Sequence, residues 1–186
     1  MKMLPVEEIP TIFSDIEPIP QDDGPSSSEA AVCTISYPRH FVIAYDYMRA
    51  IWKCKEYSDR ALRLTTLCLQ LNPANYTVWH YRRQILKQLE LYSSKESIEG
   101  DLLLASKLGG DNPKNYQIWY HRRSLLEGCG ESDKELFQFF VDKELNYISE
   151  VLNEDGKNYH AWSHRQWIIA TMNDDKLWKS ELEYGA

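Results

Sequence analysis

The sequence has few cysteines, no long apolar run and no excess of basic residues, and each absence excludes a class of protein. Only four of the 186 residues are cysteine, and none forms a Cys-x-x-Cys pair. This usage argues against a disulfide framework or a structural zinc knuckle and fits a reducing compartment. The sequence contains no apolar run of about 18 residues that would span a bilayer. The N-terminus also lacks the apolar run of a signal peptide. We therefore expect a cytoplasmic protein with no transmembrane segment.

The negative charge of the chain is concentrated near its N-terminus. The formal net charge is −7, and residues 1–30 contain seven acidic residues against one base, Lys2. The rest of the chain is nearly neutral, so it lacks the broad basic surface that neutralises phosphates on nucleic acid. Five of the eight prolines lie in residues 1–37. This stretch is predicted to be an acidic, Pro-rich arm that is extended or disordered when alone.

Residues 38–186 are organised by a repeated motif, Asn-Tyr-x-x-Trp-x-x-Arg. Its copies begin at Asn75, Asn115 and Asn158, and their tryptophans are 40 and then 43 residues apart. A period of this length indicates a stack of supersecondary units that bury their apolar faces against one another. We expect the tryptophans to be core anchors and the arginines to pair between repeats, with ligand contact by the arginines as the alternative. These residues are Trp79, Trp119 and Trp162, and Arg82, Arg122 and Arg165.

Apolar residues recur at helical spacing in the stretches around the motif, and no stretch has the pattern of a strand. A helix is predicted from about Arg39, with an apolar stripe of Phe41, Tyr45, Met48 and Trp52. Ser58, and the pairs Ser93 with Glu96 and Ser132 with Glu135, are predicted to begin further helices. The predicted fold class is all-α, an α-solenoid of helical hairpins in an α-α superhelix, which we expect to be right-handed. It comprises three repeats and the start of a fourth, whose second helix is missing.

Chemistry-bearing residues are sparse outside the repeat loops. The histidines lack metal-ligand spacing, so no metal site is expected on this chain, and no nucleophile stands with a base. The residue before each Asn-Tyr is Ala74, Lys114 and then Lys157, and the residue after it is Thr77, Gln117 and then His160. Lysines and hydrogen-bonding groups at adjacent helix N-termini would suit a phosphate or carboxylate. Solvated lysines are the alternative.

At these residues the chain resembles the α subunits shared by protein farnesyltransferases and geranylgeranyltransferases of type I. The resemblance lies in the three copies of the motif, in Asp15–Pro25 before them and in the Tyr45–Ala50 stretch that enters the array. It extends from about residue 13 to 184 with the same order and spacing. The family array continues through further repeats, so the resemblance implies that this chain is C-terminally truncated.

The resemblance implies an enzyme that works only with a second subunit. A β subunit would hold the catalytic zinc, and magnesium for farnesyl transfer, with no cofactor on this chain. The substrates would be an isoprenoid diphosphate and a protein ending in a Cys-a-a-X motif. Lys114 matches the lysine that reaches the diphosphate, and Gln117 matches the glutamine that binds the carboxylate of the substrate's last residue. Four further positions match the same rim: Tyr116, Asn158, Tyr159 and His160.

Two other functions stay open at this point. One is a helical-repeat scaffold or truncated isoform without catalysis, which the missing repeats favour. The other is the α subunit of a Rab geranylgeranyltransferase, which shares the repeat pattern but looks less similar around Gln117 and Ala161–His164. The isoprenoid itself, farnesyl or geranylgeranyl, would be chosen by the β subunit.

Overall fold

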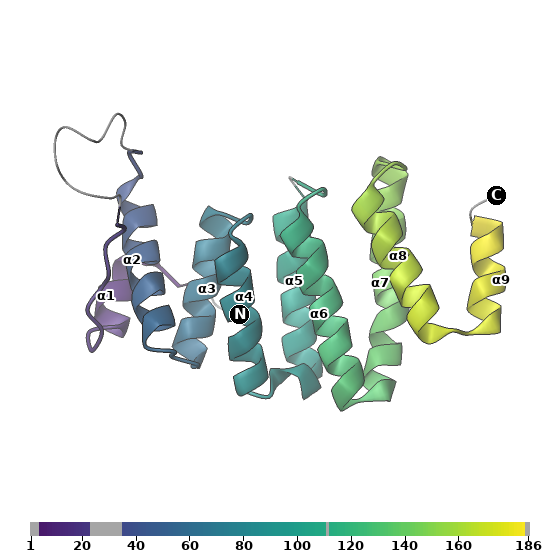
Figure 1. The fold of residues 1–186 in the computed structure, drawn as a ribbon, viewed down its shortest axis with the longest axis horizontal. Coiled ribbons are helices and arrows are strands. Elements are labelled where there is room, and N and C mark those ends of the chain that lie inside the picture. Colours follow the sequence, from purple (N-terminus) through teal and green to yellow (C-terminus); the bar gives the residue numbers. More distant parts are fainter. Residues whose placement is uncertain (1–3, 23–34, 111, 185–186) are drawn as a thin grey trace. The chain divides into compact units, whose positions relative to one another are not determined.

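The computed structural model describes residues 4–22, 35–110 and 112–184, and most of these residues lie in helices (Figure 1). Within these ranges no residue lies in a strand. The all-α prediction is therefore confirmed. The chain divides into two compact units, Met1–Leu91 and Tyr92–Ala186. The predicted boundary at residue 38, between an arm and a repeat domain, stays a prediction.

The first unit is built around three helices that follow one another along the chain. Its elements are η1 (Val6–Glu8), α1 (Ile9–Ile12), α2 (Arg39–Lys53), α3 (Asp59–Leu71) and α4 (Tyr76–Gln88). Helix α3 packs against both α2 and α4, and α1 and η1 pack against α2. The centre of this unit is fully buried and includes Ile51, Leu64 and Trp79.

The arm predicted to be extended or disordered instead packs on the first unit over residues 4–22. Ile9 and Phe13 are fully buried, so the arm contributes apolar side chains to the core. Composition alone does not reveal this, because the arm's many prolines and acids surround a few apolar residues that need a partner helix. The remaining stretch of the predicted arm, residues 23–34, lies outside the described residues.

One arginine of α3 holds the arm in place. The Arg60 guanidinium donates to the carbonyl oxygen of Ile12 at 2.8 Å and to both carboxylate oxygens of Asp15, each at 2.7 Å. Its central carbon also lies 4.8 Å from the centre of the Phe13 ring. These contacts fix the short α1 segment against a helix more than forty residues later in the chain.

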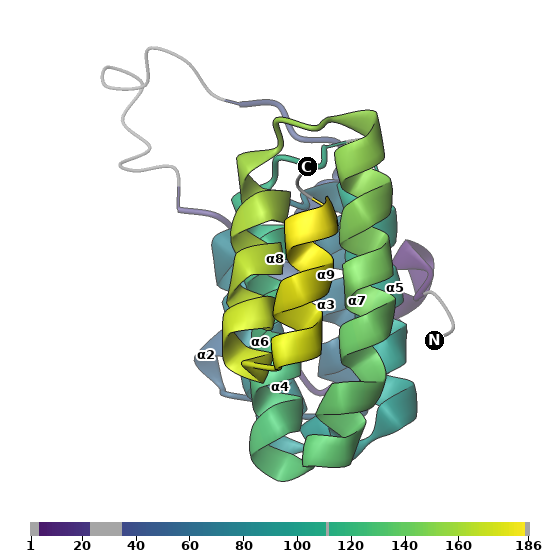
Figure 2. The ribbon, with the colours of Figure 1, turned by 90° about the vertical axis from the view of Figure 1, so that its right-hand side faces the viewer.

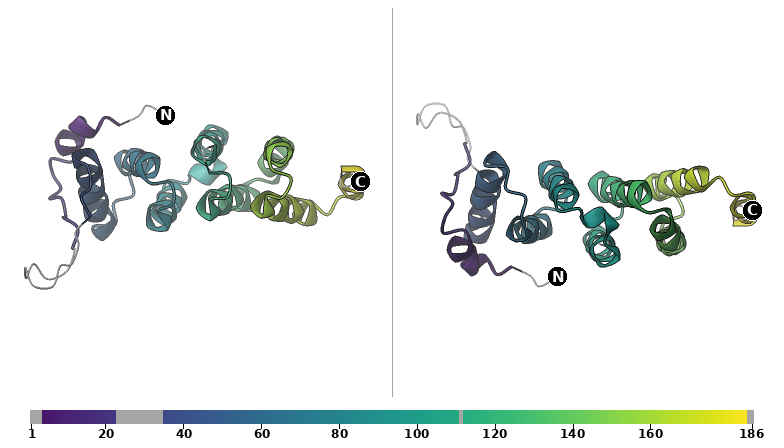
Figure 3. Two further views of the ribbon diagram at one scale, coloured as in Figure 1. Left: turned by 90° about the horizontal axis from the view of Figure 1, so that it is seen from above. Right: turned by 90° about the horizontal axis from the view of Figure 1, so that it is seen from below.

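The second unit repeats a helical hairpin twice and adds one helix. After the turn η2 (Leu91–Ser93) its helices are α5 (Lys95–Gly109), α6 (Tyr116–Ser132), α7 (Lys134–Glu154), α8 (Tyr159–Met172) and α9 (Asp175–Tyr184). Within this unit α5 and α7 form one layer, and α6 and α8 form the other (Figure 3). Helix α9 follows α8 along the chain (Figure 2), and the Arg165–Glu181 ion pair joins the two helices.

Side-chain caps begin most of these helices, with two corrections to the predicted positions. Ser58 caps α3 as predicted, accepting from the Ala61 N–H at 3.2 Å. Helix α5 is capped by Ser94 rather than Ser93, and α7 by Asp133 rather than Ser132. Asp133 accepts two backbone N–H bonds and brings a negative charge to the positive helix end. Ser132 is instead the last residue of α6.

The repeated tryptophans anchor each hairpin by the same hydrogen bond. The indole N–H of Trp79, Trp119 and Trp162 donates to the carbonyl six residues earlier, at 2.8, 2.7 and 2.9 Å. Trp79 and Trp119 are buried as predicted, whereas 40% of Trp162 is exposed. The prediction of a core position is therefore wrong for Trp162, whose indole bond is kept although part of its ring stays uncovered.

The repeated arginines are buried, and the predicted pairing with the following repeat is found for Arg122 and Arg165. Arg82, Arg122 and Arg165 donate to the carbonyl oxygens of Leu62, Leu102 and Leu145 in the preceding helix. Arg122 also reaches Glu144 in the following hairpin, and Arg165 reaches Glu181 of α9. These guanidinium groups tie successive helices together and present no face to a ligand.

Candidate functional site

The Asn-Tyr motif begins α4, α6 and α8 in the same way. In each copy the asparagine side chain accepts a backbone N–H from the first turn, at 3.0 to 3.1 Å. The tyrosine that follows is the first residue of the helix and points away from the core. The exposed fractions of Tyr76, Tyr116 and Tyr159 are 70, 63 and 76%. Large aromatic rings thus stand exposed at equivalent positions of three repeats.

Within the second unit these helix starts form a hollow of about 240 Å³ between α6 and α8. It is lined by Tyr116, Trp119, Tyr120, Arg123, Tyr159, His160, Ser163 and His164. The His160 ring forms a T-shaped contact with Tyr116 across the two helices, with ring centres 5.8 Å apart, and another with Tyr159 on its own helix at 5.9 Å. Three of the predicted site residues, Tyr116, Tyr159 and His160, are therefore brought together.

Lys114 lies in the loop that enters α6, and its ammonium is exposed. Its Nζ forms an ion pair with Asp155 Oδ2 at 2.9 Å, in the loop that enters α8, and 64% of the lysine side chain is exposed. The hydrogen bond from Lys114 lowers the pKa of the Asp155 carboxyl below its ordinary value, and the Lys157 backbone N–H adds to this. The ammonium is paired but not buried, so it stays accessible to an anion from solution.

Asn158 joins the two loops from the inside. It is fully buried, its Oδ1 accepts the His160 and Ala161 backbone N–H groups, and its Nδ2 donates to the Pro113 carbonyl at 3.1 Å. The same carbonyl accepts the Trp119 indole N–H. Because every polar atom of Asn158 is used within the fold, we propose that it positions the Lys114 loop rather than contacting a substrate.

Gln117 stands in the first turn of α6 and is half-buried. Its backbone N–H is bonded to the Asn115 side chain at 3.0 Å. It does not line the hollow between α6 and α8, so its predicted place in the site stays a prediction.

Sequence reasoning missed several residues of this site. Tyr120, Arg123 and Ser163 line the hollow one to two turns into their helices, where nothing in the motif marks them. Arg123 lies over the Trp167 ring at 4.8 Å and pairs with Glu127. Asp155 could have been singled out from the sequence, because it is charged whereas the equivalent residues of the other two copies are the neutral Asn72 and Asn112.

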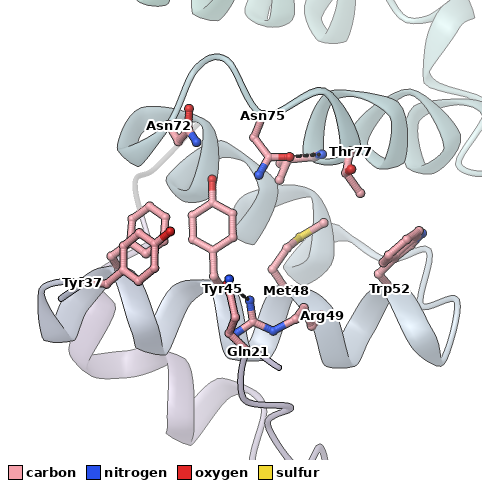
Figure 4. Close-up of a pocket in the computed structure, with 11 residues that line it drawn as sticks. Gln21, Tyr37, Tyr45, Met48, Arg49, Trp52, Asn72, Asn75 and Thr77 are labelled. Atoms are coloured by element: carbon pink, nitrogen blue, oxygen red, sulfur yellow. Dashed lines mark hydrogen bonds between the residues drawn. The ribbon is translucent and has the colours of Figure 1, made fainter. Parts of the chain in front are cut away.

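A related hollow of about 250 Å³ lies in the first unit, between α2 and the start of α4 (Figure 4). Asn75 and Thr77 face Tyr45, Met48 and Trp52 across it. Phe41 and Trp52, which the sequence placed on the apolar stripe of α2, line this hollow instead of being fully buried.

The two hollows differ in the basic residue beside them. Ala74 stands where the later copies have lysine. Arg49, which lines the hollow, donates to the Ile19 carbonyl at 2.8 Å and pairs with Asp46. The repeat motif therefore provides an exposed ammonium only in its second and third copies.

The chemistry available at the second-unit site is recognition of anions and polar groups. It offers an ammonium, three exposed phenols (Tyr116, Tyr120 and Tyr159) and an imidazole beside two helix N-termini, whose positive dipole ends favour negative charge. Among the described residues no group of three His, Cys, Asp or Glu side chains could hold a metal ion. No helix in the same described part of the chain is long and apolar enough to cross a membrane.

Comparison with known proteins identifies the repeat. The family model described as "Protein prenyltransferase alpha subunit repeat" matches residues 58–89, 98–129 and 141–172. Curated relatives named as the α subunit of protein farnesyltransferase/geranylgeranyltransferase type-1 include one from Pisum sativum, 47% identical over 89 residues, and one from Dictyostelium discoideum, 44% identical over 90 residues. These matches cover 47 and 48% of this chain but 26% of each relative, so they span about a quarter of the relatives' length.

Two further comparisons bear on the fold and on the Rab alternative. A solved structure, Candida albicans protein geranylgeranyltransferase-I complexed with GGPP, matches 88% of this chain and 52% of that chain, with a TM-score of 0.71 and 31% identity. This likeness and the repeat model agree with the predicted α-solenoid of helical hairpins. A geranylgeranyl transferase type-2 α subunit from Schizosaccharomyces pombe matches over only 34 residues, at 56% identity and 18% of this chain.

Proposed function

Because the chain belongs to the protein prenyltransferase alpha subunit repeat family, we propose that it acts as the α subunit of a protein farnesyltransferase or type I geranylgeranyltransferase. Its partner is a β subunit, and the complex transfers an isoprenoid group from its diphosphate to the cysteine of a C-terminal Cys-a-a-X motif. Neither subunit is an enzyme alone in this proposal. The complex is expected in the cytoplasm.

One observation in this chain carries the proposal. The exposed Lys114 ammonium stands at the loop before Tyr116, and its ion-pair partner Asp155 stands at the loop before Tyr159 and His160. The cation and the polar rings of the hollow therefore share the same pair of helix starts. Such a surface suits the diphosphate of an isoprenoid at the boundary with a second polypeptide.

In the proposed reaction the substrate thiolate forms a C–S bond to C1 of the isoprenoid while the C1–O bond breaks. The electron pair of the broken bond stays with the diphosphate, so negative charge grows on its oxygens in the transition state. The Lys114 ammonium attracts that growing negative charge. This attraction is stronger in the transition state than in the ground state, so it speeds the reaction. A zinc ion on the β subunit would bind the cysteine sulfur of the substrate and favour its thiolate form.

Apart from Asn158, the remaining predicted residues take binding roles in this proposal. Gln117, in the first turn of α6, binds the terminal carboxylate of the Cys-a-a-X substrate through its side-chain amide. The rings of Tyr116, Tyr159 and His160 shape the surface beside the diphosphate. These rings are exposed in the chain alone, as expected of a surface that the partner subunit and the substrates cover in the complex.

Co-expression with a β subunit tests the proposed function. The expected result is that the two chains purify together and transfer a labelled isoprenoid to a Cys-a-a-X peptide, with no transfer by either chain alone. Co-purification without transfer would instead support the non-catalytic scaffold. Transfer that requires an escort protein and a Rab substrate would support the type II enzyme.

A further inference from the structure

The loop that enters α8 carries a negative charge that its conformation does not need. Asp155 caps the C-terminus of α7 with φ −138° and ψ 88°, and Asn72 caps α3 with φ −150° and ψ 89°. Asp155 Oδ1 accepts the Lys157 N–H at 3.1 Å, and Asn72 Oδ1 accepts the Ala74 N–H at the same distance. A neutral amide thus forms the same turn in the first repeat. The turn itself therefore does not require a negative charge at Asp155.

The second carboxylate oxygen of Asp155 makes the contact that distinguishes this repeat. Oδ1 is used in the turn, and Oδ2 accepts from Lys114 Nζ at 2.9 Å. The first repeat has Ala74 two residues after Asn72, and no loop lysine of its own. The charge therefore occurs where a neighbouring loop presents an ammonium.

The fold keeps this carboxylate within reach of Lys114. The Pro113 carbonyl, directly before Lys114, accepts hydrogen bonds from Trp119 of its own helix and from Asn158 of the next hairpin. Asn158 follows Asp155 by three residues, and its backbone N–H bonds the Asp155 carbonyl at 3.0 Å. The two loops are thus tied together at their backbones, on the buried side of the exposed ion pair.

We propose that Asp155 is the resting counter-ion of Lys114, which an anionic diphosphate displaces when it binds. This inference rests on the proposed function and names Asp155 as a positioning residue for the same site. An exposed ion pair is weak and is screened by salt, so a diphosphate with several charges can take over the ammonium. Asp155 therefore lowers the affinity for the isoprenoid diphosphate and for the inorganic diphosphate product, and it speeds product release.

The test uses Asp155→Asn in the heterodimer with the β subunit, measured by titration with the isoprenoid diphosphate and by inhibition with inorganic diphosphate. Because a competing charge is removed and the turn is kept, we expect both dissociation constants to fall by about threefold or more. Asp174→Asn is the matched control. Asp174 makes the same type of bond, to the N–H two residues later, at 2.9 Å, and its substitution removes the same charge.

A second comparison shows whether the effect passes through Lys114. In the Lys114→Ala background, Asp155→Asn should change neither constant by more than about 1.5-fold, since the partner of the carboxylate is already gone. If Asp155→Asn lowered both dissociation constants by the same factor in that background, Asp155 would act on the ligand without Lys114. That result would overturn the inference. Unchanged or weaker binding by Asp155→Asn alone would overturn it as well.

These outcomes separate the inference from the proposed function. A wild-type heterodimer that binds the isoprenoid diphosphate but gains nothing from Asp155→Asn sinks only the counter-ion role. A wild-type heterodimer that does not bind the isoprenoid diphosphate refutes both.

Discussion

Arg122 and Glu144 form a bidentate ion pair that is almost fully buried, with both N–O distances 2.6 Å. Arg122 comes from α6 and Glu144 from α7, so the pair joins one hairpin to the next. His164 Nε2 of α8 lies 2.9 Å from Glu144 Oε1, which places a third helix on the same carboxylate. The second unit is thus centred on a charge network rather than on apolar contacts alone.

Removing Glu144 should strongly destabilise the second unit. Glu144→Ala leaves the buried guanidinium of Arg122 without its counter-charge, and breaking one partner of a buried pair costs about 3–5 kcal/mol. We expect a loss of this size in the free energy of unfolding, measured by urea denaturation. The control is Glu99→Ala, which breaks the Lys143–Glu99 pair, where half of each side chain is exposed, and should change stability little. Equal losses in both variants would contradict the structural role of the network.

The same carboxylate should give the stability a dependence on acid pH. Burial raises the pKa of Glu144, but the charge of Arg122 and the hydrogen bonds from His164 and Arg122 outweigh burial and hold it at about 2, below the ordinary 4.5. A carboxyl whose pKa is lower in the folded state stabilises the fold above its unfolded pKa, and this contribution is lost as pH falls from 4.5 towards 2.

Glu144→Gln tests this pH dependence because it keeps the shape of the side chain and removes the titration. The difference in the free energy of unfolding between wild type and variant, measured in denaturant series, should be constant above about pH 5.5 and shrink below about pH 4.5. A difference that stays constant down to about pH 3 would show that Glu144 does not titrate as described.

Two helical glycines should respond to alanine in opposite directions. A Cβ on Gly128 in α6 would lie 2.5 Å from Cδ1 of Tyr92, whereas a Cβ on Gly100 in α5 would meet nothing within 4 Å. Gly128→Ala is therefore expected to cost about 1–3 kcal/mol by overpacking. Gly100→Ala should stabilise by about 0.5–1 kcal/mol, because alanine favours the helix. Thermal unfolding of the two variants distinguishes these effects, and a neutral Gly128→Ala would mean that the Tyr92 ring moves freely.

Gln117 should act on the protein substrate and not on the isoprenoid. In the heterodimer, Gln117→Ala removes the proposed hydrogen bond to the peptide carboxylate, and a bond to a charged group contributes about 1.5–3 kcal/mol. The KM for a Cys-a-a-X peptide should therefore rise by about tenfold or more, with the affinity for the isoprenoid diphosphate unchanged. Weakened isoprenoid binding with an unchanged peptide KM would reverse this assignment.

The fold could be predicted where its signals are local and repeated along the chain. It could not be predicted where it depends on contacts between residues that are distant in sequence. The Asn75, Asn115 and Asn158 caps and the indole bonds of the three tryptophans are local to their own helix starts, so the motif specifies them. The buried Phe13 contacts Tyr47 and Arg60, which lie far away in sequence, and composition gave no sign of these contacts. The one-residue shift from Ser93 to Ser94 shows how closely spaced serines leave the cap undecided.

Part of the candidate site could be proposed from positions at which the copies differ from one another. Lys114, Gln117 and His160 stand where the copies have unlike residues, whereas Tyr116 and Tyr159 are the repeated tyrosine of the motif and were named from the family resemblance. Asn158 belongs to the invariant part of the motif, and its burial fits the structural role that invariance suggests. Residues such as Tyr120 and Ser163 reach the hollow only because α6 and α8 are neighbours in one layer, which no local pattern encodes.

The rate of the chemical step in the heterodimer tests the central claim most directly. In single-turnover transfer of a labelled isoprenoid to a Cys-a-a-X peptide, Lys114→Ala should slow the step by about tenfold or more, because an ammonium facing the leaving group is lost. Peptide affinity should stay the same, and Lys107→Ala, at an exposed lysine of α5, should match the wild type. A normal rate for Lys114→Ala, with only weaker diphosphate binding, would contradict the catalytic role of this lysine.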